Sequence, residues 1–262
     1  MSENSQNSEA KRSARERLAQ ERERTKAKEK RRRTLIVASA VVGVLGLAAV
    51  VGLIAANAGK DGGKATAGPV VAPSGAIGKD ALAIRVGQES AKSKLVVWED
   101  FRCPACKAFE DGYRTTIHEL EAKGQLQVEY HLVTLIDGNM GGSGSLKSAN
   151  AAACAQDAGH FPAYHDVLFE NQPPEVDDAY GKNEKLLELA AKVPGLDSAA
   201  FRGCVTDGAH NAWVKKSYDA FKAGNFRGTP TVQLNGKDIF SDQADPLTPQ
   251  KLKAKVEAAA KG

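Results

Sequence analysis

The stretch that decides the fold is KLVVWEDFRCPAC, residues 94–106. Leu95 to Val97 form a continuous apolar run, which is typical of a strand covered on both faces. Beyond this stretch the apolar residues recur at spacings of three and four, which predicts one buried stripe of a helix: Cys106, Phe109, Tyr113, Ile117 and Leu120. Cys103 and Cys106 therefore lie where a strand ends and a helix begins.

This position gives the two cysteines a chemical interpretation. The first backbone N–H groups of a helix are unpaired and carry partial positive charge, which favours a thiolate. Cysteines in such settings have pKa values of about 3.5 to 7.5. Pro104 suits the first helical position, where its missing N–H costs nothing. We expect Cys103 to be the attacking sulfur and Cys106, one turn further in, to be the buried resolving sulfur of a redox pair.

A structural alternative for these cysteines is a buried thiol pair or half of a zinc site. Zinc sites of this kind need a second C-x-x-C or His pair at matching spacing. Cys154 and Cys204 are far apart in the sequence, and the five histidines include no pair at i, i+4. The sequence predicts neither a metal ion nor any other cofactor.

The periodicity along residues 81–261 predicts an α/β domain. Strand, helix and strand follow one another from residue 94 to residue 133, which predicts a right-handed crossover with a parallel strand pair. A helical block and a final hairpin with its turn at Asn235-Gly236 come next, followed by a helix with Thr248 as N-cap and Pro249 at its first position. The predicted strands are 81–86, 94–98, 125–133, 231–234 and 239–240, and the predicted helices of the block are 146–158, 161–171, 183–192, 198–205 and 211–223.

These features together resemble the thioredoxin superfamily, and within it the DsbA-like thiol-disulfide oxidoreductases of the membrane-anchored bacterial type. The resemblance covers about residues 78–262 and implies a thioredoxin-like fold with a helical insertion at about 146–225. The residues that carry it are Phe101-x-Cys103-Pro104-x-Cys106, Ala152-Ala153-Cys154-Ala155, the segment from Phe161 to Phe169, and Gly228-Thr229-Pro230-Thr231.

The resemblance implies that Pro230 is cis and faces the cysteine pair, and that the Thr229 backbone binds an extended substrate peptide. It further implies oxidation of reduced secreted or membrane proteins and reoxidation by a quinone-linked membrane partner. Two alternatives remain open, a thiol reductase or isomerase and a non-catalytic binding module. Strong oxidants of the family carry Pro-His between the cysteines, whereas this chain has Pro104-Ala105. We therefore expect the pKa of Cys103 to lie above about 3.5.

Two further sets of residues are candidates for a role. Cys154 and Cys204 each have apolar neighbours at helical spacing, so a disulfide between two helices is expected in an oxidising compartment, with two free buried thiols as the alternative. Glu99 and Asp100 precede the motif, where a buried carboxylate could shuttle the proton of Cys106. Solvated residues at a strand end are the favoured interpretation of these two acids.

The N-terminal part has a different composition. Residues 1–33 hold 12 of the 36 Lys and Arg residues and 6 of the 32 Asp and Glu residues, which leaves 24 basic and 26 acidic residues, a net charge of −2, for the rest. A domain without a net positive charge is not expected to bind nucleic acid. Residues 1–33 are predicted to be a solvated cytoplasmic tail.

An uncharged run from Leu35 to Ala56 follows Arg31-Arg32-Arg33. Its length suits a bilayer core of about 30 Å, and the basic residues on its N-terminal side predict a cytoplasmic N-terminus. We expect a signal anchor at 34–57 in the lipid bilayer, a linker at 58–76, and the domain at 77–262 outside the cytoplasmic membrane. A cleaved signal peptide ending at Ala58 is the alternative.

Overall fold

The computed structural model describes residues 69–242 and 244–261. The predicted tail 1–33, the predicted anchor 34–57 and most of the predicted linker 58–76 lie outside the described residues. Among the described residues, no helix combines the length and the apolar content needed to cross a membrane.

A five-stranded sheet forms the centre of the described part, with the strand order β1-β3-β2-β4-β5. Strands β2 and β3 pair in parallel, and the other neighbours pair antiparallel. The predicted parallel pair is therefore confirmed. The strands are β1 (Ile84–Val86), β2 (Ser93–Glu99), β3 (Leu126–Leu132), β4 (Thr231–Leu234) and β5 (Lys237–Asp238).

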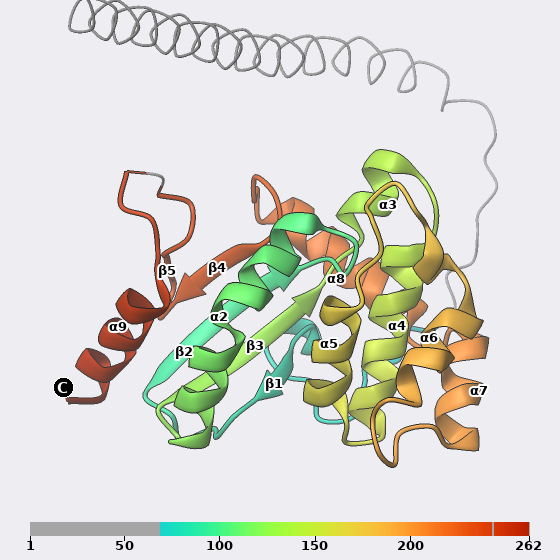
Figure 1. The fold of residues 1–262 in the computed structure, drawn as a ribbon, viewed down its shortest axis with the longest axis horizontal. Helices are drawn as coiled ribbons and strands as arrows, with labels where there is room; N and C mark the ends of the chain where they lie inside the picture. Colours follow the sequence, from blue (N-terminus) through green and yellow to red (C-terminus); the bar gives the residue numbers. More distant parts are fainter. Residues whose placement is uncertain (1–68, 243, 262) are drawn as a thin grey trace, which may run out of the picture. The chain divides into compact units, whose positions relative to one another are not determined.

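Helices cover both faces of this sheet (Figure 1). Tyr130 of β3 packs against Phe161 on α5 (Phe161–Glu170), which lies beside α2 (Pro104–Ala122). The next residue, His131, points to the opposite face and stacks on Trp98, with ring centroids 3.9 Å apart. Trp98 in turn contacts Phe221 of α8 (Asn211–Ala223). Strand alternation thus places α8 behind the sheet and α2 with α5 in front of it.

The connection from β3 to β4 consists of helices joined by loops and contains no strand, as predicted. Its helix α3 was not predicted, because its sequence LIDGNM is short and contains Gly and Asn, both poor helix formers. The helices of this block are α3 (Leu135–Met140), α4 (Gly144–Asp157), α5 (Phe161–Glu170), α6 (Asn183–Ala190), α7 (Ala199–Asp207) and α8 (Asn211–Ala223), with a 3₁₀ turn, η2, at Ala179–Gly181. The final helix, α9 (Pro249–Lys261), packs on α2.

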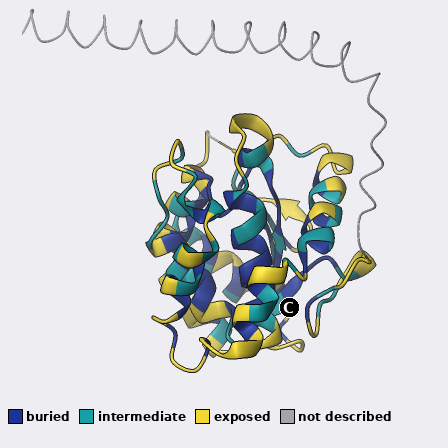
Figure 2. Ribbon diagram, turned by 90° about the vertical axis from the view of Figure 1, so that its right-hand side faces the viewer, coloured by how far each residue is buried: buried dark blue, intermediate teal, exposed yellow. Residues whose placement is uncertain are grey.

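Helix α4 is the centre of the helical block. Nearly all of its residues from 148 to 155 are small, and all of them are buried. Small side chains let α5, α7 and α8 approach α4 closely, and Figure 2 shows buried residues gathered beneath helices whose outer faces are exposed. The thioredoxin-like fold with a helical insertion is confirmed.

Strands β2 and β3 differ from their predicted bounds by one residue at each end, and two other strands were predicted less accurately. The first strand begins at Ile84 rather than Ala81, because Lys79–Ala81 forms a 3₁₀ turn, η1. The second strand of the hairpin is Lys237–Asp238 rather than residues 239–240. The Asp238 carboxylate accepts hydrogen bonds from the backbone N–H groups of Phe240 and Ser241, so the chain turns away from the sheet there.

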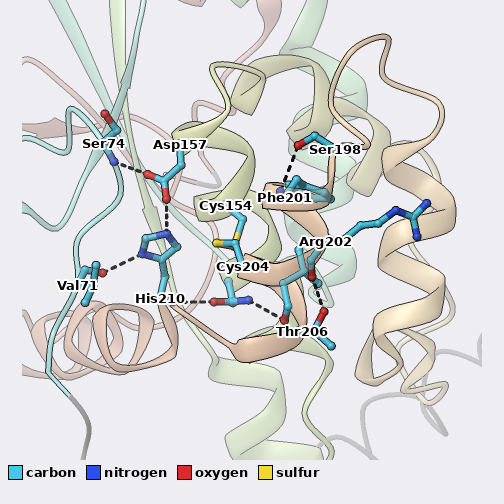
Figure 3. The surroundings of a disulfide bond; sticks show 12 residues. Val71, Ser74, Cys154, Asp157, Ser198, Phe201, Arg202, Cys204, Thr206 and His210 are labelled. Atoms are coloured by element: carbon cyan, nitrogen blue, oxygen red, sulfur yellow. Dashed lines mark hydrogen bonds and ion pairs between the residues drawn. A yellow bond between two sulfur atoms is a disulfide. The ribbon is translucent and has the colours of Figure 1, made fainter.

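A disulfide joins Cys154 of α4 to Cys204 of α7 (Figure 3). Beside it, the His210 ring lies 2.8 Å from an Asp157 carboxylate oxygen and 2.9 Å from the Val71 carbonyl oxygen. The backbone N–H of Ser74 also donates to Asp157. Residues 71–74, within the predicted linker, are therefore attached to the helical block next to the disulfide.

Replacing both Cys154 and Cys204 by Ala is expected to lower the free energy of unfolding by roughly 2 to 4 kcal/mol, because the crosslink restricts the unfolded chain. Urea unfolding of the variant and of the parent chain measures the difference. An unchanged urea midpoint would show that the crosslink adds no stability.

Candidate active site

The turn between β2 and α2 is fixed by Asp100. Its two carboxylate oxygens accept hydrogen bonds of 2.8 Å from the backbone N–H groups of Arg102 and Ile136. The Asp100 carbonyl accepts another, of 2.9 Å, from the N–H of Cys103. Cys103 consequently occupies the N-cap of α2 with extended backbone angles, and Pro104 takes the first helical position.

The two sulfurs of the motif differ in their surroundings. Cys106 is completely buried, whereas Cys103 keeps 6% of its surface accessible, and both are free thiols. The Cys103 thiol donates to the carbonyl oxygen of Thr229 over 3.3 Å. The peptide bond between Thr229 and Pro230 is cis. The structure thus brings together the four predicted site residues, which are far apart in the sequence: Cys103, Cys106, Thr229 and Pro230.

The pKa values of the two thiols move in opposite directions. A hydrogen bond from the Cys106 thiol lowers the pKa of Cys103 from 9.0 to about 6. Burial opposes this effect, while the Thr229 side chain and the backbone N–H groups of Ala105 and Cys106 add to it. Burial raises the pKa of Cys106 well above its ordinary value. The lowered pKa favours a thiolate at Cys103, and the raised pKa favours a protonated thiol at Cys106.

The interpretation of Glu99 and Asp100 as solvated strand-end residues was wrong, because both are completely buried. Burial raises the pKa of Asp100 to about 7, although both of its oxygens accept backbone hydrogen bonds. Glu99 points to the helical block, where its carboxylate lies 2.8 Å from a ring nitrogen of His165 on α5. The two acids therefore have different surroundings and different partners.

Glu110 and His165 are functional candidates that the sequence reasoning missed. Glu110 is buried on the apolar face of α2, so a carboxylate inside that stripe was the available signal. Ligand atoms of Glu99, Glu110 and His165 lie within 4.8 Å of one another, with Glu99 and His165 joined by their hydrogen bond. The other such group, Cys154, Cys204 and His210, has both sulfurs tied in the disulfide.

Arg102, the residue before Cys103, was also missed. Its guanidinium is buried and contacts the carboxylates of Asp137, at 2.7 Å, and Asp178, at 3.2 Å. It also donates to the carbonyl oxygens of Gly141 and Glu175. Arg102 thus ties two loops of the helical block to the start of α2, and no pattern in the sequence indicated these partners.

A groove of about 540 Å³ lies beside the motif. Ala105 of the motif lines it together with residues 225–232 and Phe240. The groove therefore leads along the cis peptide bond toward the start of α2.

The family model described as Thioredoxin matches residues 80–258. The chain belongs to the thioredoxin family. The resemblance to the DsbA-like thiol-disulfide oxidoreductases is confirmed by the curated relatives and the solved structures together. The disulfide bond formation protein D of Bacillus subtilis is 26% identical over 182 residues, which cover 68% of this chain and 77% of that protein. The probable disulfide bond formation protein D of Bacillus cereus is 25% identical over 154 residues, which cover 58% of this chain and 69% of that protein.

Among solved structures, oxidised DsbA of Mycobacterium tuberculosis has 28% identity and a TM-score of 0.59, covering 69% of this chain and 93% of that one. MdbA, a thiol-disulfide oxidoreductase of Actinomyces oris, has 25% identity and a TM-score of 0.56. The match covers 68% of this chain and 88% of that one.

The Cys103 thiolate is expected to titrate with a midpoint near 6. The measurement is the ultraviolet absorbance of the thiolate in the reduced protein as a function of pH, with Cys103→Ser as the control that removes the signal. A midpoint at or below about 3.5, or near the 8.5 of a free thiol, would contradict the proposed surroundings of this sulfur.

Proposed function

We propose that this domain oxidises cysteine thiols of secreted or membrane proteins, with Cys103 as the attacked sulfur and Cys106 as the buried resolving sulfur. The observation that carries the proposal is the contrast between the two sulfurs. Cys103 is the more accessible and has the lowered pKa, whereas Cys106 is buried and has the raised pKa. Disulfide exchange proceeds fastest through an accessible sulfur that is also a good leaving thiolate.

The reaction has two steps. A substrate thiolate attacks Sγ of Cys103, the bond between the two motif sulfurs breaks, and its electron pair leaves with Cys106, which takes up a proton. A second substrate thiolate then attacks the substrate sulfur of the mixed disulfide and expels the Cys103 thiolate. The substrate loses two electrons and gains a disulfide, and the enzyme dithiol holds those electrons.

The lowered pKa of Cys103 favours the oxidase direction. Stabilising the thiolate stabilises the reduced enzyme, which makes its disulfide a stronger oxidant. A reductase or isomerase would use the same two sulfurs with a reduction potential near the −270 mV or so of thioredoxin. A binding module without turnover would not need a cysteine pair with opposed pKa shifts.

We also propose that substrate binds as an extended peptide along the groove beside Thr229 and Pro230. Backbone groups of Thr229 offer hydrogen bonds to an added strand, and the Thr229 carbonyl already faces Cys103. A substrate strand in the groove would bring its cysteine to Cys103, the more accessible of the two sulfurs.

The proposed location is the outer side of the cytoplasmic membrane, with residues 34–57 as the anchor. The disulfide between Cys154 and Cys204 supports an oxidising compartment. A quinone-linked membrane protein that returns the dithiol to the disulfide completes the proposed cycle, as the resemblance implies.

Replacing one sulfur at a time distinguishes the two roles. Incubated with a disulfide-containing peptide, the variant Cys106→Ser is expected to accumulate a stable mixed disulfide, because Cys103 attacks and nothing resolves the product. Cys103→Ser is expected to accumulate at least about tenfold less, since the Cys106 thiol is buried and mostly protonated. Mass spectrometry of the adducts measures both. Equal trapping by the two variants would refute the assignment of Cys103, and trapping by neither would refute the enzymatic function.

A further inference from the structure

The segment that follows α5, residues 169–175, lies along the cysteine motif and has no role in the reaction described so far. Lys107 donates a hydrogen bond of 2.8 Å through Nζ to the Phe169 carbonyl oxygen. Arg102 donates one of 3.1 Å to the Glu175 carbonyl oxygen. The segment is therefore attached to the residue before the cysteine pair and to the residue after it.

Between these two attachments, the side chain of Gln172 contacts the backbone of the motif. Its Nε2 group donates a hydrogen bond of 2.9 Å to the Phe101 carbonyl oxygen and another of 3.0 Å to the Cys103 carbonyl oxygen. A primary amide has two N–H donors, so both are used here. One side chain thus fixes the carbonyl groups on either side of Arg102.

The two carbonyl groups depend on this amide to different degrees. The Cys103 carbonyl oxygen also accepts the first hydrogen bond of the helix, of 3.1 Å, from the N–H of Lys107. The Phe101 carbonyl oxygen has no other donor within the described residues. Since Phe101 is 1% exposed, loss of the amide would leave this oxygen unpaired and largely away from water, which is costly.

The local sequence holds Gln172 in place before any substrate arrives. Its backbone N–H donates to the Phe169 carbonyl oxygen over 3.3 Å, which ends α5 and turns the chain toward the motif. Pro173 and Pro174 follow. A residue before a proline is restricted to extended backbone conformations, and each proline fixes its own φ. Little further conformational entropy is lost when the amide reaches the two carbonyls.

The backbone that Gln172 holds also sets the position of the Cys103 sulfur. Cys103 has a φ of −76° and a ψ of 119°, the extended conformation of an N-cap residue. Rotation about these bonds would move the sulfur away from the Cys106 thiol and from the backbone N–H groups of Ala105 and Cys106. These groups lower the pKa of Cys103.

We propose that Gln172 is a positioning residue of the disulfide reaction: its side-chain amide holds the backbone from Phe101 to Cys103 so that the Cys103 sulfur stays at the start of α2. The inference rests on the proposed function and adds a residue outside the motif that sets how strongly the reduced enzyme is stabilised. Gln172 acts through the backbone of Cys103 rather than on the sulfur itself.

The test compares the variant Gln172→Met with the unmodified full chain. Methionine is similar in length but has no N–H donor, and Lys107 and Arg102 still hold the segment, so the variant is expected to fold. Its Cys103 thiolate is expected to titrate at least about one pH unit higher. The equilibrium constant for oxidising glutathione at pH 7 is then expected to fall about fivefold, because the reduced form loses thiolate stabilisation.

Gln156→Met is the matched control. The Nε2 group of Gln156 on α4 also donates to a backbone carbonyl oxygen, that of Ser74, over 2.9 Å. This substitution removes the same kind of hydrogen bond from a part of the helical block that does not contact the motif backbone. The control is expected to keep the thiolate midpoint and the glutathione equilibrium of the unmodified chain.

A folded Gln172→Met variant with an unchanged thiolate midpoint would overturn the inference, and so would an equal shift in Gln156→Met. A second measurement requires no variant. In the reduced unmodified chain, the NMR signals of the Gln172 Nε2 protons are expected to shift with the midpoint of Cys103. Constant signals from about pH 4 to about pH 8 would contradict the proposed coupling. A thiolate midpoint near the 8.5 or so of a free thiol in the unmodified chain would instead refute the proposed function itself.

Discussion

The active-site interpretation depends on one turn, in which the chain leaves β2 and starts α2 with Cys103 at the N-cap. Asp100 fixes this turn by accepting three backbone hydrogen bonds through its carboxylate and carbonyl oxygens. The turn points the unpaired N–H groups of the helix toward Cys103, while the next turn of the helix buries Cys106. The Cys106 thiol lowers the pKa of Cys103 most, the backbone N–H groups add to this effect, and burial raises the pKa of Cys106.

The helical insertion contributes to the site as well as to the core. Its helix α5 supplies His165 to Glu99, and Asp137 of α3 together with Asp178 before η2 holds Arg102. The disulfide joins α4 to α7, and the small buried residues along α4 pack closely against the neighbouring helices. The insertion therefore covers the residues next to the dithiol with charged and aromatic groups: His165 contacts Glu99 and Phe101, and Asp137 and Asp178 contact Arg102.

Most of the fold could be predicted because local patterns carried it. The apolar run of β2, the stripe on α2 and the turn at Asn235-Gly236 are each readable from a few neighbouring residues. The burial of Glu99 and Asp100 could not be read in this way, since their partners, His165 and Ile136, lie far along the chain. The same holds for Arg102, whose carboxylate partners are Asp137 of α3 and Asp178 just before η2, two separate segments of the helical block. Hydrogen bonds between distant segments leave no periodicity in the sequence.

The most direct test of the central claim is the reduction potential of the couple formed by Cys103 and Cys106, measured in the full chain against glutathione buffers at pH 7. A stabilised Cys103 thiolate predicts an oxidising couple, clearly more positive than the −270 mV or so of thioredoxin. A potential at or below that value would contradict the account, because the thiolate would then not be stabilising the reduced enzyme.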